Sequence, residues 1–370
     1  MDNGFNFGRI FGIQFRIHYS WVFIYFLITV FLALQVFPGA VPKETDVTFW
    51  VMGAVTALLF FLSVLFHEAA HALVGQNNGI PVKSITLFLF GGAAQMTREP
   101  QTAAAELKMA LAGPMTSLVL AAVFYGTYYY FLGTVNVLAA IALWLSQINL
   151  IVAVFNMLPG FPLDGGRIFR GLWWHFRHDY EKATRVAIFI GRIFGFIIVG
   201  AGAYFIIYYS DWLAGIWLAV IGLYLEYSAR TSLKQFEMQL WLKGWNISDV
   251  TNWDCPIVRG GLTTKELKQQ YPNCRSFWVE EDGQTAGVLL LSEAGDLAGV
   301  KAIKELSQPI EAALEITSET GLLTVVQEFN ETDKDFAVVI GHNGQRGLLF
   351  LDSLVDLVNQ KMKSAAQNQA

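Results

Sequence analysis

Residues 49–75 read FWVMGAVTALLFFLSVLFHEAAHALVG, a long apolar run with three ionisable side chains near its end. A helix of about 20 apolar residues is long enough to cross the hydrocarbon core of a membrane. Ionisable groups at that depth are costly, by at least about 2.5 kcal/mol at the membrane centre. His67, Glu68 and His71 together therefore indicate a function. The alternative is a helix that ends at His67 and leaves a solvated polar tip.

These three residues form a His-Glu-x-x-His motif, which has a defined chemistry on a helix. Residues four apart lie on one helix face, so His67 and His71 can bind one metal ion. Glu68 lies next to them and is placed to act as the general base that activates water at the metal. Because the motif is short and recurs by chance, its position in an apolar helix carries the prediction.

A catalytic zinc site needs a third protein ligand and one open position. The candidate ligand is Asp164, in residues 156–167, NMLPGFPLDGGR, at the end of the fourth apolar segment. This stretch lies on the same side of the membrane as the end of the second segment, so we expect Asp164 at the depth of His67 and His71. The alternative role of Asp164 is to cap the helix that follows.

The composition excludes an ordinary soluble protein, because 54% of the 370 residues are hydrophobic and only 15% are charged. The net charge of -5 and the lack of a basic cluster argue against a nucleic-acid partner. Cys255 and Cys274 are expected to be reduced thiols in a cytosolic compartment. Six segments are predicted to span the membrane: 21–37, 49–75, 107–132, 135–158, 186–208 and 212–227.

Lysine and arginine between the spans predict the orientation, because cytoplasmic loops carry an excess of them. If the N-terminus is cytoplasmic, the outside connections hold only Lys43. The inside segments hold Arg9, Arg16, Lys83, Arg98, Lys108, Arg167, Arg170, Arg177, Lys182, Arg185, Arg230 and Lys234. We therefore predict a multi-pass protein of the cell membrane whose termini and soluble C-terminal domain face the cytoplasm.

Two segments near the membrane alternate like β-strands, namely residues 9–18 and residues 82–96, which contain the pair Gly91-Gly92. β-Branched residues and a glycine pair favour short strands and turns. Because unpaired strand edges cannot face lipid, these strands should lie at the membrane interface or against protein.

The sequence resembles the site-2 protease family of intramembrane zinc metalloproteases, in its bacterial and archaeal branch with a C-terminal CBS pair. The resemblance rests on residues 67–71 and 156–166, in that order, with further matches at 90–93 and 112–114. It implies a membrane-protein substrate with a transmembrane segment, held in the lipid bilayer and cut with the help of one Zn²⁺ ion per chain.

The same resemblance implies roles for single residues. His67, His71 and Asp164 would be the zinc ligands, and Glu68 the general base. Asn156 would position the substrate or stabilise the transition state. Pro162 would shape its loop, and residues 84–96 would form a strand that pairs with an unwound substrate.

From residue 245 to residue 357 the chain has two similar halves, each interpreted as a helix–strand–turn–strand unit. In both halves a glycine-containing turn joins two short apolar runs, which is a hairpin-like signal. The apolar runs are residues 277–279 and 287–291 in the first half, and 336–340 and 347–350 in the second. This pattern resembles a pair of CBS modules, a regulatory fold that often binds adenosine nucleotides and often dimerises, so the resemblance also implies a homodimer through the pair.

CBS modules that bind ribose commonly show Gly, then Thr or Ser three residues on, then Asp at six. Gly287 is instead followed by Leu290 and Glu293, and Gly347 by Phe350 and Ser353. Neither half fits, which puts nucleotide binding in doubt and leaves a packing or dimerisation module as an equal alternative.

The predicted fold is a polytopic α-helical membrane protein with about six transmembrane helices, short membrane-associated strands and a C-terminal α/β CBS-pair domain. The expected domains are 1–230 (transmembrane metalloprotease), 231–244 (linker), 245–362 (CBS pair) and 363–370 (tail). The predicted function is intramembrane zinc proteolysis of membrane-tethered proteins, as in regulated intramembrane proteolysis. A CBS-regulated transport protein would leave the His67–His71 motif unexplained. An inactive scaffold that binds membrane segments is disfavoured by the intact Glu68.

Overall fold

The computed structural model describes residues 4–10, 12–88, 91–96, 98–272, 274–281, 283–291, 302–332 and 334–355. The chain divides into two compact units, Met1–Phe236 and Glu237–Ala370. The predictions for Phe90, for Glu293 and for a tail at 363–370 lie outside the described residues.

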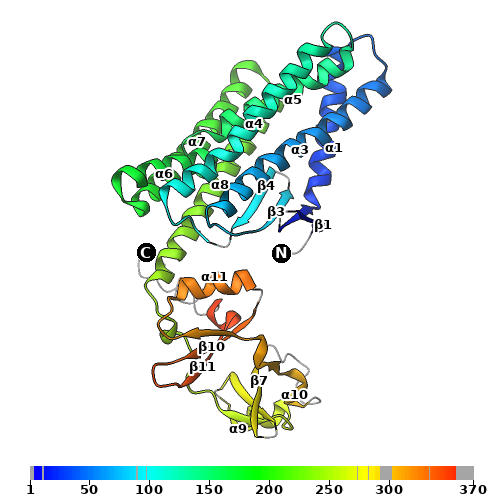
Figure 1. Ribbon diagram of the computed structural model, residues 1–370. Helices are drawn as coiled ribbons and strands as arrows, with labels where there is room; N and C mark the ends of the chain where they lie inside the picture. The colour runs from blue at the N-terminus through cyan, green and yellow to red at the C-terminus, as the bar shows by residue number, and fades with distance from the viewer. Residues whose placement is uncertain are drawn as a thin grey trace. The chain divides into compact units, whose positions relative to one another are not determined.

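Six helices of the described chain are long and apolar enough to cross a membrane, as predicted (Figure 1). Large apolar side chains such as Phe26, Val119 and Ile207 are exposed on them, as expected for helices that face lipid. The first is a composite of α1 (Ser20–Phe31), a π-helical turn (Leu32–Val36) and α2 (Phe37–Ala40). The others are α3 (Asp46–Asn77), α4 (Ala103–Phe131), α5 (Asn136–Asn156), α7 (Tyr180–Tyr209) and α8 (Trp212–Lys243).

Helix α8 is longer than the sequence suggested, because the sixth span was expected to end at residue 227 and the helix continues to Lys243. The polar residues of this extension, among them Arg230, Lys234 and Glu237, are good helix formers. Loss of hydrophobicity therefore does not end the helix, and most of the expected linker at 231–244 is helical.

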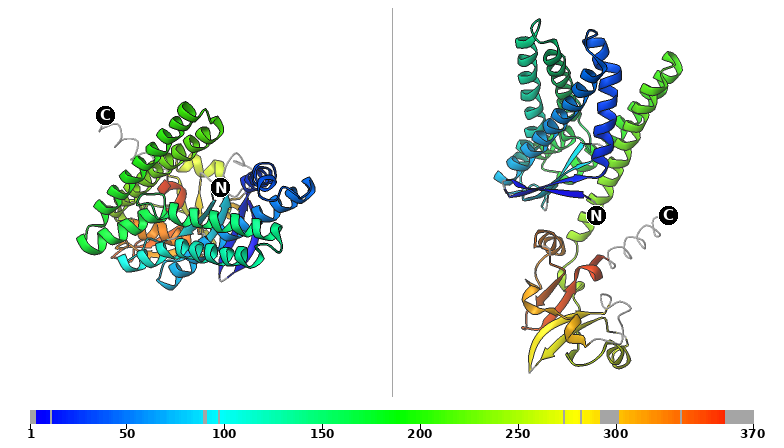
Figure 2. Two further views of the ribbon diagram at one scale, coloured as in Figure 1. Left: turned by 90° about the horizontal axis from the view of Figure 1, so that it is seen from above. Right: turned by 90° about the vertical axis from the view of Figure 1, so that its right-hand side faces the viewer.

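A four-stranded sheet lies at one end of the helices of the N-terminal unit (Figures 1 and 2). Its strands are β1 (Gly4–Ile10), β2 (Ile13–His18), β3 (Val82–Phe88) and β4 (Gly91–Met96), in that order across the sheet. Strands β2 and β3 are parallel and the other pairs antiparallel. The run at 9–18 was expected as one strand, but a turn at Gly12, with φ of 79°, divides it between β1 and β2.

The sheet packs against the half of α3 that carries the histidine motif. Ile13 of β2 and Val82 and Ile85 of β3 form a buried cluster with Ala72 of α3. Strand β4 lies at the open edge of the sheet, beside α3.

The C-terminal unit contains two β-α-β-β arrangements. The first is β5 (Ile257–Arg259), α9 (Thr264–Gln270), β6 (Ser276–Glu281) and β7 (Gln284–Leu290), extended by α10 (Ile303–Leu306) and β8 (Gln308–Pro309). The second is β9 (Leu314–Thr317), α11 (Leu322–Thr332), β10 (Phe336–Ile340) and β11 (Arg346–Phe350). The predicted hairpins β6–β7 and β10–β11 are present. Cys255 and Cys274 are both free cysteines.

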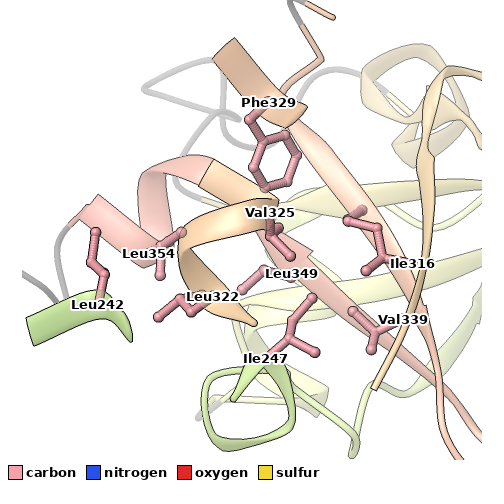
Figure 3. Packing of buried hydrophobic residues seen from close by; sticks show 10 residues of the cluster. Leu242, Ile247, Ile316, Leu322, Val325, Phe329, Val339, Leu349 and Leu354 are labelled. Atoms are coloured by element: carbon pink, nitrogen blue, oxygen red, sulfur yellow. The ribbon is translucent and has the colours of Figure 1, made fainter. Parts of the chain in front are cut away.

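The helices of the two halves differ from the prediction. Residues 247–250 and 310–313, which were expected to be the helix that begins each half, contain only short 3-10 turns, Ile247–Asp249 and Ile310–Ala312. Helices α9 and α11 lie further along the chain. In the second half, Val325 and Phe329 of α11 pack on Val339 and Leu349 of the sheet (Figure 3). This apolar contact fixes α11 on one face of the three-stranded sheet.

Candidate metal centre

The two histidines of the motif lie on one face of α3 and point into the helix bundle. His67 and His71 are 4% and 6% exposed, so neither forms a solvated helix tip. Helix α3 continues past both residues to Asn77, which rules out the alternative of a helix that ends at His67. Their Nε2 atoms are 3.2 Å apart.

Asp164 is the first residue of α6 (Asp164–Arg177) and faces these histidines. Its Oδ2 atom is 3.2 Å from His67 Nε2 and 3.1 Å from His71 Nε2. The helix is preceded by Leu163, which makes no side-chain cap, so the Asp164 carboxylate turns to the histidines instead of capping α6. Burial opposes ionisation of Asp164, but the two imidazoles outweigh it and lower the pKa of the carboxyl, which favours the charged form.

The three atoms fit a zinc ion. Zinc–ligand distances of about 2.0–2.2 Å in a tetrahedral site place neighbouring ligand atoms about 3.3 Å apart. The observed separations of 3.1–3.2 Å among the three atoms form one face of such a tetrahedron. The fourth position remains for water or substrate, as catalytic zinc sites require.

Hydrogen bonds from α4 orient both imidazole rings. His71 Nδ1 lies 2.7 Å from the carbonyl oxygen of Met109, so this nitrogen must donate, and in the neutral ring Nε2 is the nitrogen that can bind a metal ion. His67 Nδ1 lies 2.9 Å from Ser117 Oγ. In the neutral His71 ring, Nε2 and the Asp164 oxygen 3.1 Å away are both acceptors, and a cation between them would bind both.

Gly113 of α4 fits between these two contacts. A Cβ at this position would lie 2.1 Å from His71 Nε2 and 2.6 Å from His67 Nε2. Only a residue without a side chain leaves this space open. Met109, Gly113 and Ser117, four residues apart on one helix face, therefore line one side of the metal centre.

Glu68 lies beside the three proposed metal ligands and under strand β4. A Cβ at Gly92 would come within 2.3 Å of Glu68 Cγ, so the backbone of the edge strand passes directly over this side chain. His71, His67, Asp164 and Arg167 are the charged or titratable groups that interact with it electrostatically.

Asn156 is the half-buried last residue of α5, immediately before the loop that leads to Asp164. The loop itself docks on α7, where Phe161 N–H donates to Ala187 O at 3.2 Å. A Cβ at Gly191 would lie 1.8 Å from Phe161 O, so a glycine is needed for this approach. The structure thus brings Glu68 and the three proposed ligands together, and places Asn156 at the entrance of the loop.

The sequence alone predicted no role at the metal centre for Met109, Gly113, Ser117, Gly92 or Gly191. For Gly92 and Gly113 the family resemblance was an available signal, because both glycines belong to segments that carry it. Met109 acts through its carbonyl, Ser117 through its hydroxyl and Gly191 through a close backbone contact, and none of these has a local sequence signature.

Residues 55–143 and 133–199 match Peptidase family M50. The protein sll0528 of Synechocystis sp., named as a zinc metalloprotease, is 33% identical over 303 residues, which cover 78% of this chain and 76% of the relative. The chain belongs to peptidase family M50. Rip3 of Mycobacterium tuberculosis, also named as a zinc metalloprotease, is 33% identical over 79% of this chain and 75% of its own length. Membership makes the protein a site-2 type, multi-pass zinc metalloprotease whose cofactor is Zn²⁺, and it sets the transport alternative aside.

Two solved structures resemble separate parts of this M50 peptidase. The site-2 protease from Methanocaldococcus jannaschii is 27% identical, with a TM-score of 0.44, and covers 62% of this chain and 94% of its own. The CBS domain of the bacterial CNNM/CorC family Mg²⁺ transporter is 13% identical, with a TM-score of 0.26, and covers 33% of this chain and 79% of its own.

Proposed function

We propose that His67, His71 and Asp164 hold the catalytic zinc ion and that the enzyme cleaves transmembrane segments of membrane-tethered proteins. The observation that carries this proposal is the convergence of the three ligand atoms, 3.1–3.2 Å apart, from α3, which can span a membrane, and from the first residue of the shorter helix α6. Zinc, when bound, supplies a Lewis acid that polarises the peptide carbonyl and makes water a stronger nucleophile.

Glu68 is the proposed general base. Its carboxylate accepts the proton that water gives up on attack and delivers it to the nitrogen of the leaving amine, so that the peptide bond is hydrolysed without a covalent enzyme intermediate. Asn156 is proposed to position the substrate or stabilise the transition state from the end of α5, and Pro162 to shape the intervening loop.

Strand β4 is the proposed docking edge for the substrate. A transmembrane helix hides its peptide bonds in its own hydrogen bonds, so the substrate must unwind before it can be cut. An extended peptide that pairs with the outer edge of β4 would regain main-chain hydrogen bonds. Because Gly92 of β4 passes over Glu68, such a peptide would lie beside the catalytic base.

The excess of lysine and arginine on one side supports an orientation with both termini and the C-terminal unit in the cytoplasm. The centre then lies toward the cytoplasmic leaflet, and cleavage would release a fragment inward, as in regulated intramembrane proteolysis. Mass spectrometry of the products of a test substrate with known topology checks this. We expect a cut in the cytoplasmic half of its transmembrane segment, and a cut near the outer leaflet would contradict the orientation.

The C-terminal unit is proposed to be a CBS pair that regulates or dimerises the protease. Its β-α-β-β halves support this fold. A cavity of about 590 Å³ lies in its first half, lined by Arg259 and Lys304 but also by Glu280, Glu281 and Glu305. Acidic side chains outnumber basic ones there, which disfavours phosphate groups. We therefore expect no shift in the melting temperature of the full-length protein with ATP or AMP, and a saturable shift would restore the nucleotide hypothesis.

A further inference from the structure

A buried ion pair joins α4 to α6 next to the metal centre. Arg170 of α6 is 4% exposed and Glu106 of α4 is fully buried. Arg170 Nε donates to Glu106 Oε1 at 2.5 Å, and a second guanidinium nitrogen contacts the same oxygen. Burying two charges is expensive even when they are paired, so such a pair calls for a role beyond stability.

Aromatic rings and a second carboxylate complete the surroundings of Arg170. Its guanidinium carbon lies 4.9 Å from the ring centre of Phe161 and 4.8 Å from that of Tyr180. Glu99 Oε2 is 3.6 Å from the guanidinium and accepts a hydrogen bond from the Tyr180 hydroxyl at 3.2 Å. The planar group is therefore held on its faces and along its edge, which leaves it one orientation.

The ion pair connects the parts of the chain that build the metal centre. Glu106 lies one turn before Met109, whose carbonyl accepts the hydrogen bond from His71. Arg170 lies six residues after Asp164 on the same helix, and Phe161 lies three residues before it. Arg170 thus ties α4, which sets the orientation of both histidines, to the helix that begins with Asp164. Through its contact with the Phe161 ring, Arg170 also holds the loop that precedes Asp164.

The two helices are also in close contact beyond the ion pair. A Cβ at Gly171 of α6 would lie 2.9 Å from Leu107 Cγ of α4. Close packing sets the spacing of the helices but allows them to slide or rotate. The directed bond between Arg170 and Glu106 removes that freedom, since it holds only at one register of α6 on α4.

We infer that Glu106 and Arg170 are positioning residues that fix the distance from Asp164 to His67 and His71, and so set the affinity for zinc. This inference rests on the proposed role of Asp164 as a ligand. Neither residue is assigned a contact with substrate or zinc. Their loss should therefore weaken zinc binding while leaving catalysis intact once zinc is bound.

The test compares zinc dissociation constants of the full-length protein in detergent, measured by competition with a chelator. Glu106→Gln keeps the shape of the side chain and removes its charge. We expect zinc binding about 10–100-fold weaker, which is the range for outer contacts of metal ligands. Cleavage of a transmembrane test substrate should return to the wild-type maximal rate when free zinc is raised by the same factor. A merely structural defect would not be rescued by zinc.

Glu226→Gln is the matched control. Glu226 is also a buried carboxylate in an ion cluster, with Arg192 and Arg230, but these residues lie on α7 and α8, which carry none of the proposed ligands. The zinc affinity of Glu226→Gln should equal that of the wild type. Wild-type affinity in Glu106→Gln, or a loss of cleavage that zinc does not restore, would overturn the inference.

Two further variants keep the outcome decisive. If Glu106→Gln is not monodisperse, Arg170→Lys decides, because it keeps the charge but cannot lie between the rings of Phe161 and Tyr180. Weaker zinc binding that excess zinc overcomes supports the inference, and wild-type affinity refutes it. Asp164→Asn separates the two proposals: retained zinc in this variant would reject Asp164 as a ligand, whereas zinc lost there but kept in Glu106→Gln would reject only the positioning role.

Discussion

Replacing Gly113 by alanine should abolish high-affinity zinc binding. The added Cβ would lie 2.1 Å from His71 Nε2 and 2.6 Å from His67 Nε2. A zinc ion lies about 2.0–2.1 Å from each such nitrogen, so the methyl group would crowd both the ion and the rings that hold it. Unbonded carbon atoms need about 3.5 Å, and a similar carbon–nitrogen contact would force the rings back by more than about 1 Å.

The magnitude follows from the tolerance of metal sites. Ligand distances must hold to about 0.2 Å, which is far less than the required shift. Disturbing an outer contact alone costs about 10–100-fold in metal affinity. Gly113→Ala should therefore weaken zinc binding at least about 100-fold, or about 2.8 kcal/mol at 1.4 kcal/mol per factor of ten.

The assay is chelator competition on the purified full-length protein, with cleavage of a transmembrane test substrate in parallel. Gly126→Ala is the control, because Gly126 lies on the same helix and a Cβ there meets nothing within 4 Å. That variant should keep zinc and activity, and alanine is about 1 kcal/mol better than glycine in a helix. Wild-type zinc affinity in Gly113→Ala would refute the placement of the metal between the two histidines.

Three further outcomes follow from other contacts. Gly92→Ala should keep zinc but lose most cleavage, because its Cβ would lie 2.3 Å from Glu68 Cγ and displace the base; zinc content and cleavage rate measure this. Ser117→Ala should weaken zinc binding about 10–100-fold by removing the hydrogen bond to His67, as chelator competition would detect. Phe329→Ala should destabilise the C-terminal unit by about 3–5 kcal/mol, seen as faster hydrogen exchange in α11 and β10, with zinc content unchanged.

Matched variants sharpen two of these tests. Thr116→Ala removes a hydroxyl that donates to Ala112 O of its own helix and not to a histidine of the motif, so the zinc affinity of this variant should stay at the wild-type value. Equal affinities in Ser117→Ala and Thr116→Ala would contradict an orienting role for Ser117. Full activity in Gly92→Ala would show that β4 does not pass as closely over Glu68 as described.

The sequence was sufficient to place His67 and His71, because helix periodicity alone puts residues four apart on one face. It also brought Asp164 to them, since both segments end apolar spans on the same side of the membrane. The prediction from membrane depth was correct because ionisable groups are costly inside a membrane and therefore occur there mainly at functional sites. Long apolar helices were predictable for the same reason, as their lengths are set by the membrane.

The contacts of α4 could not be predicted in this way. Met109 acts through its carbonyl and Gly113 through the side chain that it lacks, so neither has a chemical signature of its own, and only the family resemblance marks Gly113. Their roles depend on the rotation and register of α4 on α3, which tertiary packing decides. The parallel pairing of β2 with β3 is likewise non-local, since it joins segments about 70 residues apart.

Two errors had local causes. The end of the sixth span was predicted from the loss of hydrophobicity. Hydrophobicity indicates where a helix leaves the membrane but not where the helix ends, so the extension of α8 to Lys243 was missed. Helix α9 was missed although Thr263 and Glu266 form a capping box, a sequence signal for a helix start.

The proposed mechanism is tested most directly by comparing the wild type with Glu68→Gln for zinc content and for cleavage of a transmembrane test substrate. Glu68 is the proposed base and not a ligand, so both proteins should hold one zinc ion per chain. The wild type should cut the substrate, and the variant should be slower by about 10²–10⁴-fold, the contribution of general acid–base catalysis. A Glu68→Gln enzyme that cuts at the wild-type rate, or an active wild type without zinc, would contradict the proposed mechanism.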